Sequence, residues 1–196
     1  MSTHNRDLAE QQLVTRLPNA VVLQNPVALP FATPLPWPPD TVARLAVVVR
    51  LESHHKGLDV LLDALNRALV PFNDWSLELF GLGPDEAALR QHATDLGLGE
   101  RVHFRGFESN PREIWTTCHL LVLPSRREGC SIAMLEALLC GRPVLATAVG
   151  GVSDWIKPGV NGYICPRCDI ETLTASLREA WDSRAGWPHS ARRPTG

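Results

Sequence analysis

Two basic residues near position 50 could bind a phosphorylated ligand. Arg50 ends a short apolar run, and Lys56 stands just before Gly57 and a stretch of helical period. If the run is a strand and the stretch is a helix, both cations could face one point beyond the end of the strand and hold a diphosphate. The alternative is two solvated surface cations, and the pair by itself does not separate these interpretations.

Two glutamates mark a second candidate site. The residues after Glu128 are Gly129, Cys130 and Ser131. Their amides would point out of the start of a predicted helix, which is a natural site for an anion. Glu136 lies inside an apolar run, where a carboxylate without a partner is costly. A vicinal diol such as ribose would satisfy it with two hydrogen bonds, and the alternative is an ion pair with a neighbouring arginine.

A glycine-rich turn supplies a third candidate. Gly81 and Gly83 would let backbone approach a ligand closely, and Pro84 suits the first turn of a helix. A simple tight turn is the alternative interpretation. The fingerprint G-x-G-x-x-G of dinucleotide-binding enzymes is absent from the turn after the first strand, which disfavours a dehydrogenase.

These residues are positioned by a regular alternation of elements that starts near residue 44. Short β-rich runs alternate with stretches of helical period. The expected strands are Leu45–Val49, Ser76–Phe80, Val102–Phe104, Leu120–Leu123, Val144–Ala146 and Gly162–Ile164. The expected helices are Leu58–Leu69, Asp85–Leu96, Ser131–Leu139 and Glu171–Trp181, with shorter ones after Asn110 and near Asp154.

The pattern predicts an α/β fold with a doubly wound, mostly parallel Rossmann-like sheet and helices on both faces. The strands lack polar alternation, so both of their faces are buried. Ligands bind such sheets at the carboxyl ends of the strands, where all three candidate sites lie. We expect an N-terminal segment and proline-rich linker over 1–40, the Rossmann-like domain over 41–184 and a flexible tail over 185–196.

Composition excludes several classes of protein. Of the 196 residues, 44% are hydrophobic and the formal net charge is -2, which is typical of a soluble globular domain without a nucleic-acid footprint. No apolar run reaches the roughly 20 residues of a transmembrane helix, and no signal-peptide pattern is present, so we expect a cytoplasmic protein. The sequence has no Asp-x-Asp motif and no second cysteine pair spaced for zinc, so it does not predict a metal site.

The five cysteines are expected to be free thiols, because their number is odd and the domain is of ordinary size. Cys165 and Cys168 have the spacing of a redox pair. We prefer the interpretation that they lie in a plain loop.

Taken together, these segments resemble the C-terminal, donor-binding domain of the GT4 family of retaining GT-B glycosyltransferases. The resemblance covers about residues 21–184. The matching segments are Arg50-Leu51, Lys56-Gly57, Gly81-Leu82-Gly83-Pro84, Val102-His103-Phe104-Arg105-Gly106, Ser125, Glu128-Gly129, Glu136-Ala137, Gly141-Arg142-Pro143-Val144 and Gly150-Gly151. It implies one half of a GT-B fold that binds a nucleotide-diphosphate sugar, with UDP or GDP as the nucleotide and no metal or other cofactor.

The resemblance also implies roles for individual residues. The donor diphosphate would be held by Arg50, Lys56, Gly129, Cys130 and Ser131. Glu136 would take the ribose hydroxyls, and Glu128 would be the catalytic residue at the transferred sugar. The base would meet Gly106 and Phe107, and the donor-site loop would contain Gly81 and Gly83.

Two departures from the family pattern affect the expected function. The usual E-G-F-G reads Glu128-Gly129-Cys130-Ser131 here, which makes the sugar-facing loop more polar. GT-B enzymes also carry an acceptor-binding N-terminal domain, for which the residues before Arg44 are too few. We therefore expect no appreciable transfer by this chain alone, a GT-B N-terminal domain supplied in trans, and weak self-association. A non-catalytic nucleotide-sugar-binding module or a subunit of a split enzyme is the alternative.

Overall fold

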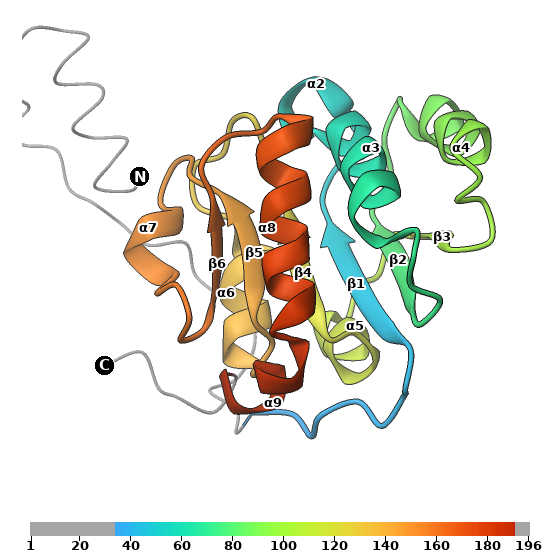
Figure 1. The fold of residues 1–196 in the computed structure, drawn as a ribbon. Coiled ribbons are helices and arrows are strands. Elements are labelled where there is room, and N and C mark those ends of the chain that lie inside the picture. Colours follow the sequence, from blue (N-terminus) through green and yellow to red (C-terminus); the bar gives the residue numbers. More distant parts are fainter. Residues whose placement is uncertain (1–33, 191–196) are drawn as a thin grey trace, which may run out of the picture.

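The alternation of apolar runs and helical periods builds one parallel sheet in residues 34–190, the part of the chain that this computed structural model describes. Its strands follow the order β3-β2-β1-β4-β5-β6 (Figure 1). They are β1 (Ala43–Val48), β2 (Trp75–Phe80), β3 (Val102–Gly106), β4 (Leu120–Leu123), β5 (Val144–Thr147) and β6 (Gly162–Cys165). This is the doubly wound order, which confirms the predicted fold class and places the topological switch point between β1 and β4.

Helices cover both faces of the sheet. Helices α3 (Leu58–Leu69), α4 (Glu86–Asp95) and α8 (Ile170–Asp182) lie on one face, and α5 (Pro111–Thr117) and α6 (Ile132–Leu139) lie on the other (Figure 1). The short helices are α2 (Ser53–Lys56), α7 (Val152–Trp155) and α9 (Trp187–Ser190), with a 3-10 turn over Arg184–Gly186. Figure 1 shows α2 at the end of the sheet toward which the strands point, and α9 at the opposite end.

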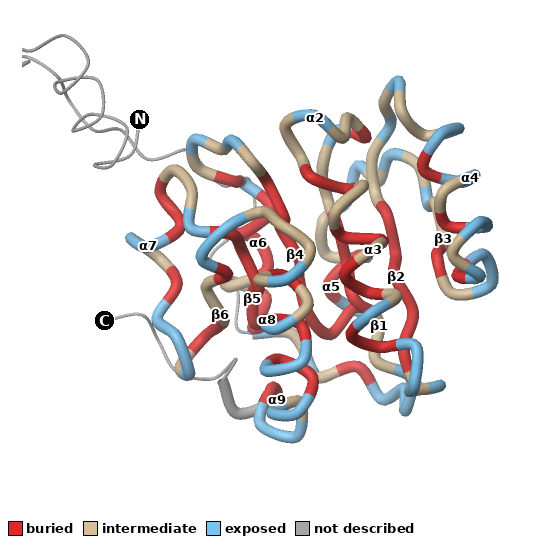
Figure 2. Tube along the Cα trace, turned by 45° about the horizontal axis from the view of Figure 1, so that its top comes forward, coloured by how far each residue is buried: buried red, intermediate tan, exposed pale blue. Residues whose placement is uncertain are grey.

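The core consists of two layers separated by the sheet, and the tube of Figure 2 is buried along the strands. In β1, Leu45 and Val47 pack against α3 and α8, whereas Ala46 faces the layer of α5 and α6. Successive strand residues therefore enter different cores, which is why the strands show no polar alternation.

The ordered domain extends beyond both predicted boundaries. Arg142 is 1% exposed and donates hydrogen bonds to the carbonyls of Leu35 and Pro36, which anchors the end of the expected linker. The expectation of a flexible tail from residue 185 is wrong for 185–190, because these residues continue the 3-10 turn and form α9. Trp187 is 2% exposed, and burial of its large ring outweighs the loop-like composition.

Residues 1–33 and 191–196, which include most of the expected N-terminal segment and linker and the end of the expected tail, lie outside the described residues. No helix formed by residues 34–190 combines the length and the apolar character that crossing a membrane requires.

Candidate functional site

The carboxyl ends of β1 and β4 bring two of the predicted site residues together. Lys56 ends α2, and its Nζ lies 2.8 Å from Oε2 of Glu128, which is 72 residues away in the sequence. The two side chains are 22% and 17% exposed, so the ion pair is only partly open to solvent. Gly57, with φ 64°, permits this approach, because a Cβ there would lie 2.2 Å from the carbonyl oxygen of Pro124.

A pair of glycines holds the loop that carries Glu128. A Cβ on Gly150, whose φ is 59°, would lie 2.1 Å from the carbonyl oxygen of Glu128. The amide of Gly151 donates to the carbonyl of Gly129 at 2.8 Å. The amide of Gly129 in turn lies 3.2 Å from Oε1 of Glu128, so this predicted ligand-binding amide is satisfied by the neighbouring carboxylate. The backbone geometry of the loop thus depends on glycine at position 150.

Helix α6 begins one residue later than the predicted anion site requires. Ser131 is the N-cap, and its Oγ accepts a hydrogen bond from the amide of Met134 at 3.3 Å. Its hydroxyl therefore stabilises the helix start rather than standing free for a ligand. Among the described residues, no acceptor is found for the amides of Ile132 and Ala133, which are the free donors at this helix end. Neither residue was among the predicted site residues.

Glu136 has the surroundings that its apolar neighbours predicted. The residue is 8% exposed, and its side chain makes no hydrogen bond or ion pair within the described part of the chain. The alternative of an arginine partner is therefore not found there. Burial raises the pKa of the Glu136 carboxyl above its ordinary value. A buried acceptor without a partner is the feature that a ligand hydroxyl would satisfy.

Three other predicted residues line the same edge of the sheet without contacting this pair. Arg50 is exposed beyond β1 and has no side-chain partner among residues 34–188. Phe107 is 74% exposed just after β3. Gly106 ends β3 with φ 74°, and its carbonyl accepts from the amide of Gly81 at 2.7 Å. No hydrogen bond or ion pair in the described structure joins these residues to Lys56 or Glu128.

The glycines of the loop after β2 meet protein backbone. A Cβ on Gly81 would lie 1.9 Å from the carbonyl oxygen of Val49, and one on Gly83 would lie 2.1 Å from that of Leu51. The amide of Leu51 donates to the carbonyl of Leu82 at 3.1 Å, so the loops after β1 and β2 are packed together. The tight-turn interpretation accounts for both glycines by this close approach.

One pair of residues near the site escaped the sequence analysis. Arg126, in the loop after β4, donates from both terminal nitrogens to the two carboxylate oxygens of Asp59, each at 2.9 Å. Asp59 lies in the first turn of α3, 67 residues earlier. Each residue looks like an ordinary surface charge in the sequence, and only the fold reveals the pairing.

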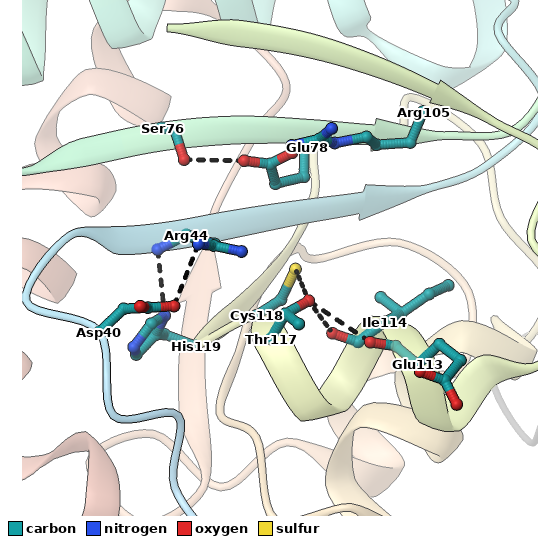
Figure 3. A network of polar contacts seen from close by, with 10 residues as sticks. All are labelled: Asp40, Arg44, Ser76, Glu78, Arg105, Glu113, Ile114, Thr117, Cys118 and His119. Carbon is teal, nitrogen blue, oxygen red and sulfur yellow. Dashed lines mark hydrogen bonds and ion pairs between the residues drawn. The ribbon is translucent and has the colours of Figure 1, made fainter.

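Other buried polar groups lie along the strands and are paired with one another (Figure 3). Glu78 accepts from Ser76 at 2.8 Å and from Arg105 at 2.6 Å. At the amino end of β1, the backbone amide of Arg44 donates to Nδ1 of His119, and burial followed by the charge of Arg142 lowers the pKa of His119 to about 4. These contacts stabilise the sheet rather than face the loops of the candidate site.

All five cysteines are free thiols, as predicted. Burial raises the pKa of both Cys130 and Cys168, which disfavours the reactive thiolate form. Within residues 34–190, no three His, Cys, Asp or Glu side chains are grouped so that they could hold a metal ion.

The family can now be identified by comparison with known proteins. Residues 38–193 match the profile described as glycosyl transferases group 1. The chain belongs to this family. The match spans every segment that builds the candidate site, from the loop after β1 to the loop that holds Glu128.

Relatives of this group 1 glycosyltransferase domain include named transferases. The lipopolysaccharide 1,6-galactosyltransferase of Salmonella typhimurium is 28% identical over 174 residues, which cover 86% of this chain and 48% of the relative. The lipopolysaccharide core biosynthesis mannosyltransferase LpsB of Rhizobium meliloti is 30% identical over 138 residues, or 67% of this chain and 39% of the relative. The eight curated relatives compared are matched over 16% to 48% of their own length.

Solved structures show the same fold. The apo form of the lipopolysaccharide outer core galactosyltransferase WaaB has a TM-score of 0.72 and 26% identity, with 85% of this chain and 50% of that chain covered. The C-terminal domain of a glycosyl transferase group 1 family protein (LpcC) from Francisella tularensis has a TM-score of 0.67 at 22% identity. The match covers 76% of this chain and 80% of that domain. At this identity the likeness supports the fold alone. The domain is thus one half of a GT-B architecture.

Proposed function

We propose that this domain binds the nucleotide-diphosphate-sugar donor for retaining transfer of its glycosyl group. The observation that carries the proposal is the partly buried pair of Lys56 and Glu128 at the switch point of the sheet. A cation and a carboxylate held there suit a ligand that carries both a diphosphate and hydroxyl groups. The curated relatives support the ligand class, because they include galactosyl and mannosyl transferases.

The charges at the site suit stabilisation of a leaving diphosphate. A diphosphate oxygen would compete with Glu128 for the ammonium of Lys56, and Arg50 is exposed at the same edge of the sheet. A pair of opposite charges about 4 Å apart is worth about 4 kcal/mol at an effective dielectric near 20. Fixed cations of this kind act where negative charge develops in the transition state. We therefore propose that the donor site requires no metal, which calorimetry of nucleoside diphosphate binding with and without a chelator would test.

The remaining polar groups would hold the rest of the donor. Glu136 is the proposed acceptor for the ribose hydroxyls, because its carboxylate has no partner within the described residues. The free amides of Ile132 and Ala133 would add donors to an anionic or hydroxyl-bearing group at the start of α6. Once a diphosphate oxygen replaces Glu128 as the partner of Lys56, the Glu128 carboxylate would face the transferred sugar.

Calorimetric titration with UDP, GDP and their sugars tests this proposal directly. Lys56→Ala should weaken binding of the nucleoside diphosphate, and a melting curve establishes the temperatures at which the variant is folded, because the change leaves the partly buried Glu128 without its partner. Lys157→Ala is the matched control, because Lys157 is the other lysine of the chain and lies exposed after α7. If wild type binds none of the ligands, or if both variants bind equally well, the donor-site proposal fails.

A binding module of a split enzyme is the second candidate. Retaining transfer needs an acceptor held against the anomeric carbon in a water-poor cleft. The relatives extend well beyond the matched region, which favours an acceptor site outside residues 34–190, in the same protein or supplied in trans. A product assay with residues 1–196, donor and mixed acceptors should then detect no turnover. A rate near 1 per second would show that these residues build a complete site.

A further inference from the structure

The two charged side chains of the candidate site come from separate loops, which follow the neighbouring, paired strands β1 and β4. Lys56 closes α2 after β1, and Glu128 lies in the loop after β4. The distance between their side chains therefore depends on how these loops are fastened. Arg126 lies two residues before Glu128 and makes the fastening contacts.

Arg126 contacts α2 and α3 through both side chain and backbone. Its Nη1 donates to the carbonyl of Ser53 at 2.6 Å, and its guanidinium spans both oxygens of Asp59 at 2.9 Å. Its amide donates to the carbonyl of His55 at 2.8 Å. Ser53 begins the helix that Lys56 ends, so one arginine grips the first turn of α3 and the start of α2 at once.

The geometry of the Arg126–Asp59 ion pair suits a role in positioning these loops more than a role in stabilising the fold. The side chains of Arg126 and Asp59 are 34% and 43% exposed, and ion pairs so open to solvent contribute about 0–1 kcal/mol. The hydrogen bond and charge of Asp59 raise the pKa of Arg126. The pKa of Asp59 is lowered: burial acts to raise it, but the hydrogen bonds and charge of Arg126 prevail. The pair is therefore ionised at neutral pH, with a planar two-point contact that a lysine would not reproduce.

We propose that Arg126 is a positioning residue that holds Lys56 against the Glu128 loop, so that both side chains meet one donor diphosphate. This inference rests on the proposed donor site. Three of the five N–H groups of Arg126 donate to Asp59 and to the carbonyl of Ser53, which fixes its guanidinium against α2 and α3, so its proposed action on the ligand is through Lys56. Misplacement by about 1 Å is enough to affect binding and catalysis strongly.

A double-mutant cycle between Arg126 and Lys56 tests this role. The probe is UDP or GDP, whichever the wild-type chain binds in calorimetry. Arg126→Ala should weaken binding about tenfold in the wild-type background. In the Lys56→Ala background the same change should have almost no further effect, because the residue through which Arg126 acts is gone. Asp59→Ala should reproduce the loss, and the double variant of Arg126 and Asp59 should bind no worse than either single variant.

Arg127→Ala is the control on the same loop, because Arg127 is exposed and only its backbone amide contacts His55. It should bind like wild type. Equal losses from Arg126→Ala in both backgrounds would indicate direct contact with the diphosphate and overturn the inference. Unchanged affinity with a lower melting temperature would show a purely structural role and overturn it too.

Two precautions keep the test decisive. If Arg126→Ala does not fold, Arg126→Lys replaces it, because an ammonium can keep one bond but not both contacts with Asp59. It should cause a smaller loss of affinity, again abolished by Lys56→Ala. If the wild-type chain binds neither nucleotide, the proposed function fails and this inference with it. If wild type binds and the cycle is additive, only the inference fails.

Discussion

Replacing Gly150 with alanine should displace the loop of Glu128. Gly150 has φ 59°, and a Cβ there would lie 2.1 Å from the carbonyl oxygen of Glu128 and 2.4 Å from that of Gly129. Both atoms belong to backbone, so no flexible side chain can yield. The carbonyl of Glu128 would have to move by about 1 Å to restore an ordinary contact. A misplacement of that size can lower the rate of an enzymatic reaction by about 100-fold.

Gly159 provides the matched comparison for this substitution. Its φ is 73°, yet a Cβ there would meet nothing within 4 Å. Gly159→Ala should therefore cost only the strain of left-handed backbone, about 1–2 kcal/mol. Gly150→Ala carries the same strain and adds steric overpacking of about 1–3 kcal/mol. Its total cost should be about 2–5 kcal/mol, which is a large part of the stability of an ordinary domain.

Two measurements check the prediction. Denaturant unfolding of wild type and both variants gives the free-energy difference, and calorimetry gives the affinity for the nucleoside diphosphate that wild type binds. Gly159→Ala should leave the affinity unchanged, and Gly150→Ala should lower it at temperatures where the variant is folded. Equal unfolding costs together with equal affinities would refute the argument that Gly150 shapes the Glu128 loop.

The other predictions concern buried titrating groups and the ribose site. Burial raises the pKa of Glu136 above its ordinary 4.5, so the native state holds this proton more tightly than the unfolded state, and stability is lost as pH rises through the raised pKa. At pH 7, Glu136→Gln should then unfold at a higher denaturant concentration than wild type. Below about pH 4 the two proteins should unfold at the same concentration. A variant that is less stable than wild type at pH 7 would contradict this. Glu136→Ala should weaken binding of ribose-bearing ligands in calorimetry and leave inorganic diphosphate binding unchanged; equal losses for both ligands would remove the ribose role. His119 has its pKa lowered from 6.5 to about 4, so wild type should lose about 3 kcal/mol as pH falls through that window. His119→Asn keeps an acceptor for the amide of Arg44 but does not titrate, so its unfolding curves should depend less on pH; an unchanged dependence would exclude His119 as the source.

Much of the fold could be predicted because the relevant signals are local. Continuous apolar runs predicted strands covered on both faces, and the strand Leu120–Leu123 was placed at its observed bounds. The helical period of 58–69 predicted α3 in the same way. Both patterns reflect contacts that repeat every two or every three to four residues, so a short window contains them. The resemblance to the GT4 pattern also singled out glutamates 128 and 136 before any contact was known.

Contacts between distant segments were decided only by the tertiary structure. Arg142 is buried, has no carboxylate partner within residues 34–190, and donates to backbone carbonyls, including that of Leu35, 107 residues away. The burial of Trp187 likewise turned an expected flexible tail into an ordered end. Composition could indicate neither contact, because it records no partner.

The site itself divides in the same way. The position of Lys56 before a predicted helix made it a candidate ligand for a diphosphate, and the resemblance to the GT4 pattern singled out Glu128. Their separation of 2.8 Å, and the clamp of Arg126 on Asp59, required the fold. Hydrogen bonds between residues 67 or 72 positions apart leave no period in the sequence, because either partner by itself resembles an ordinary surface charge. Parallel strands that end at one edge of a sheet are what bring such partners within reach of each other.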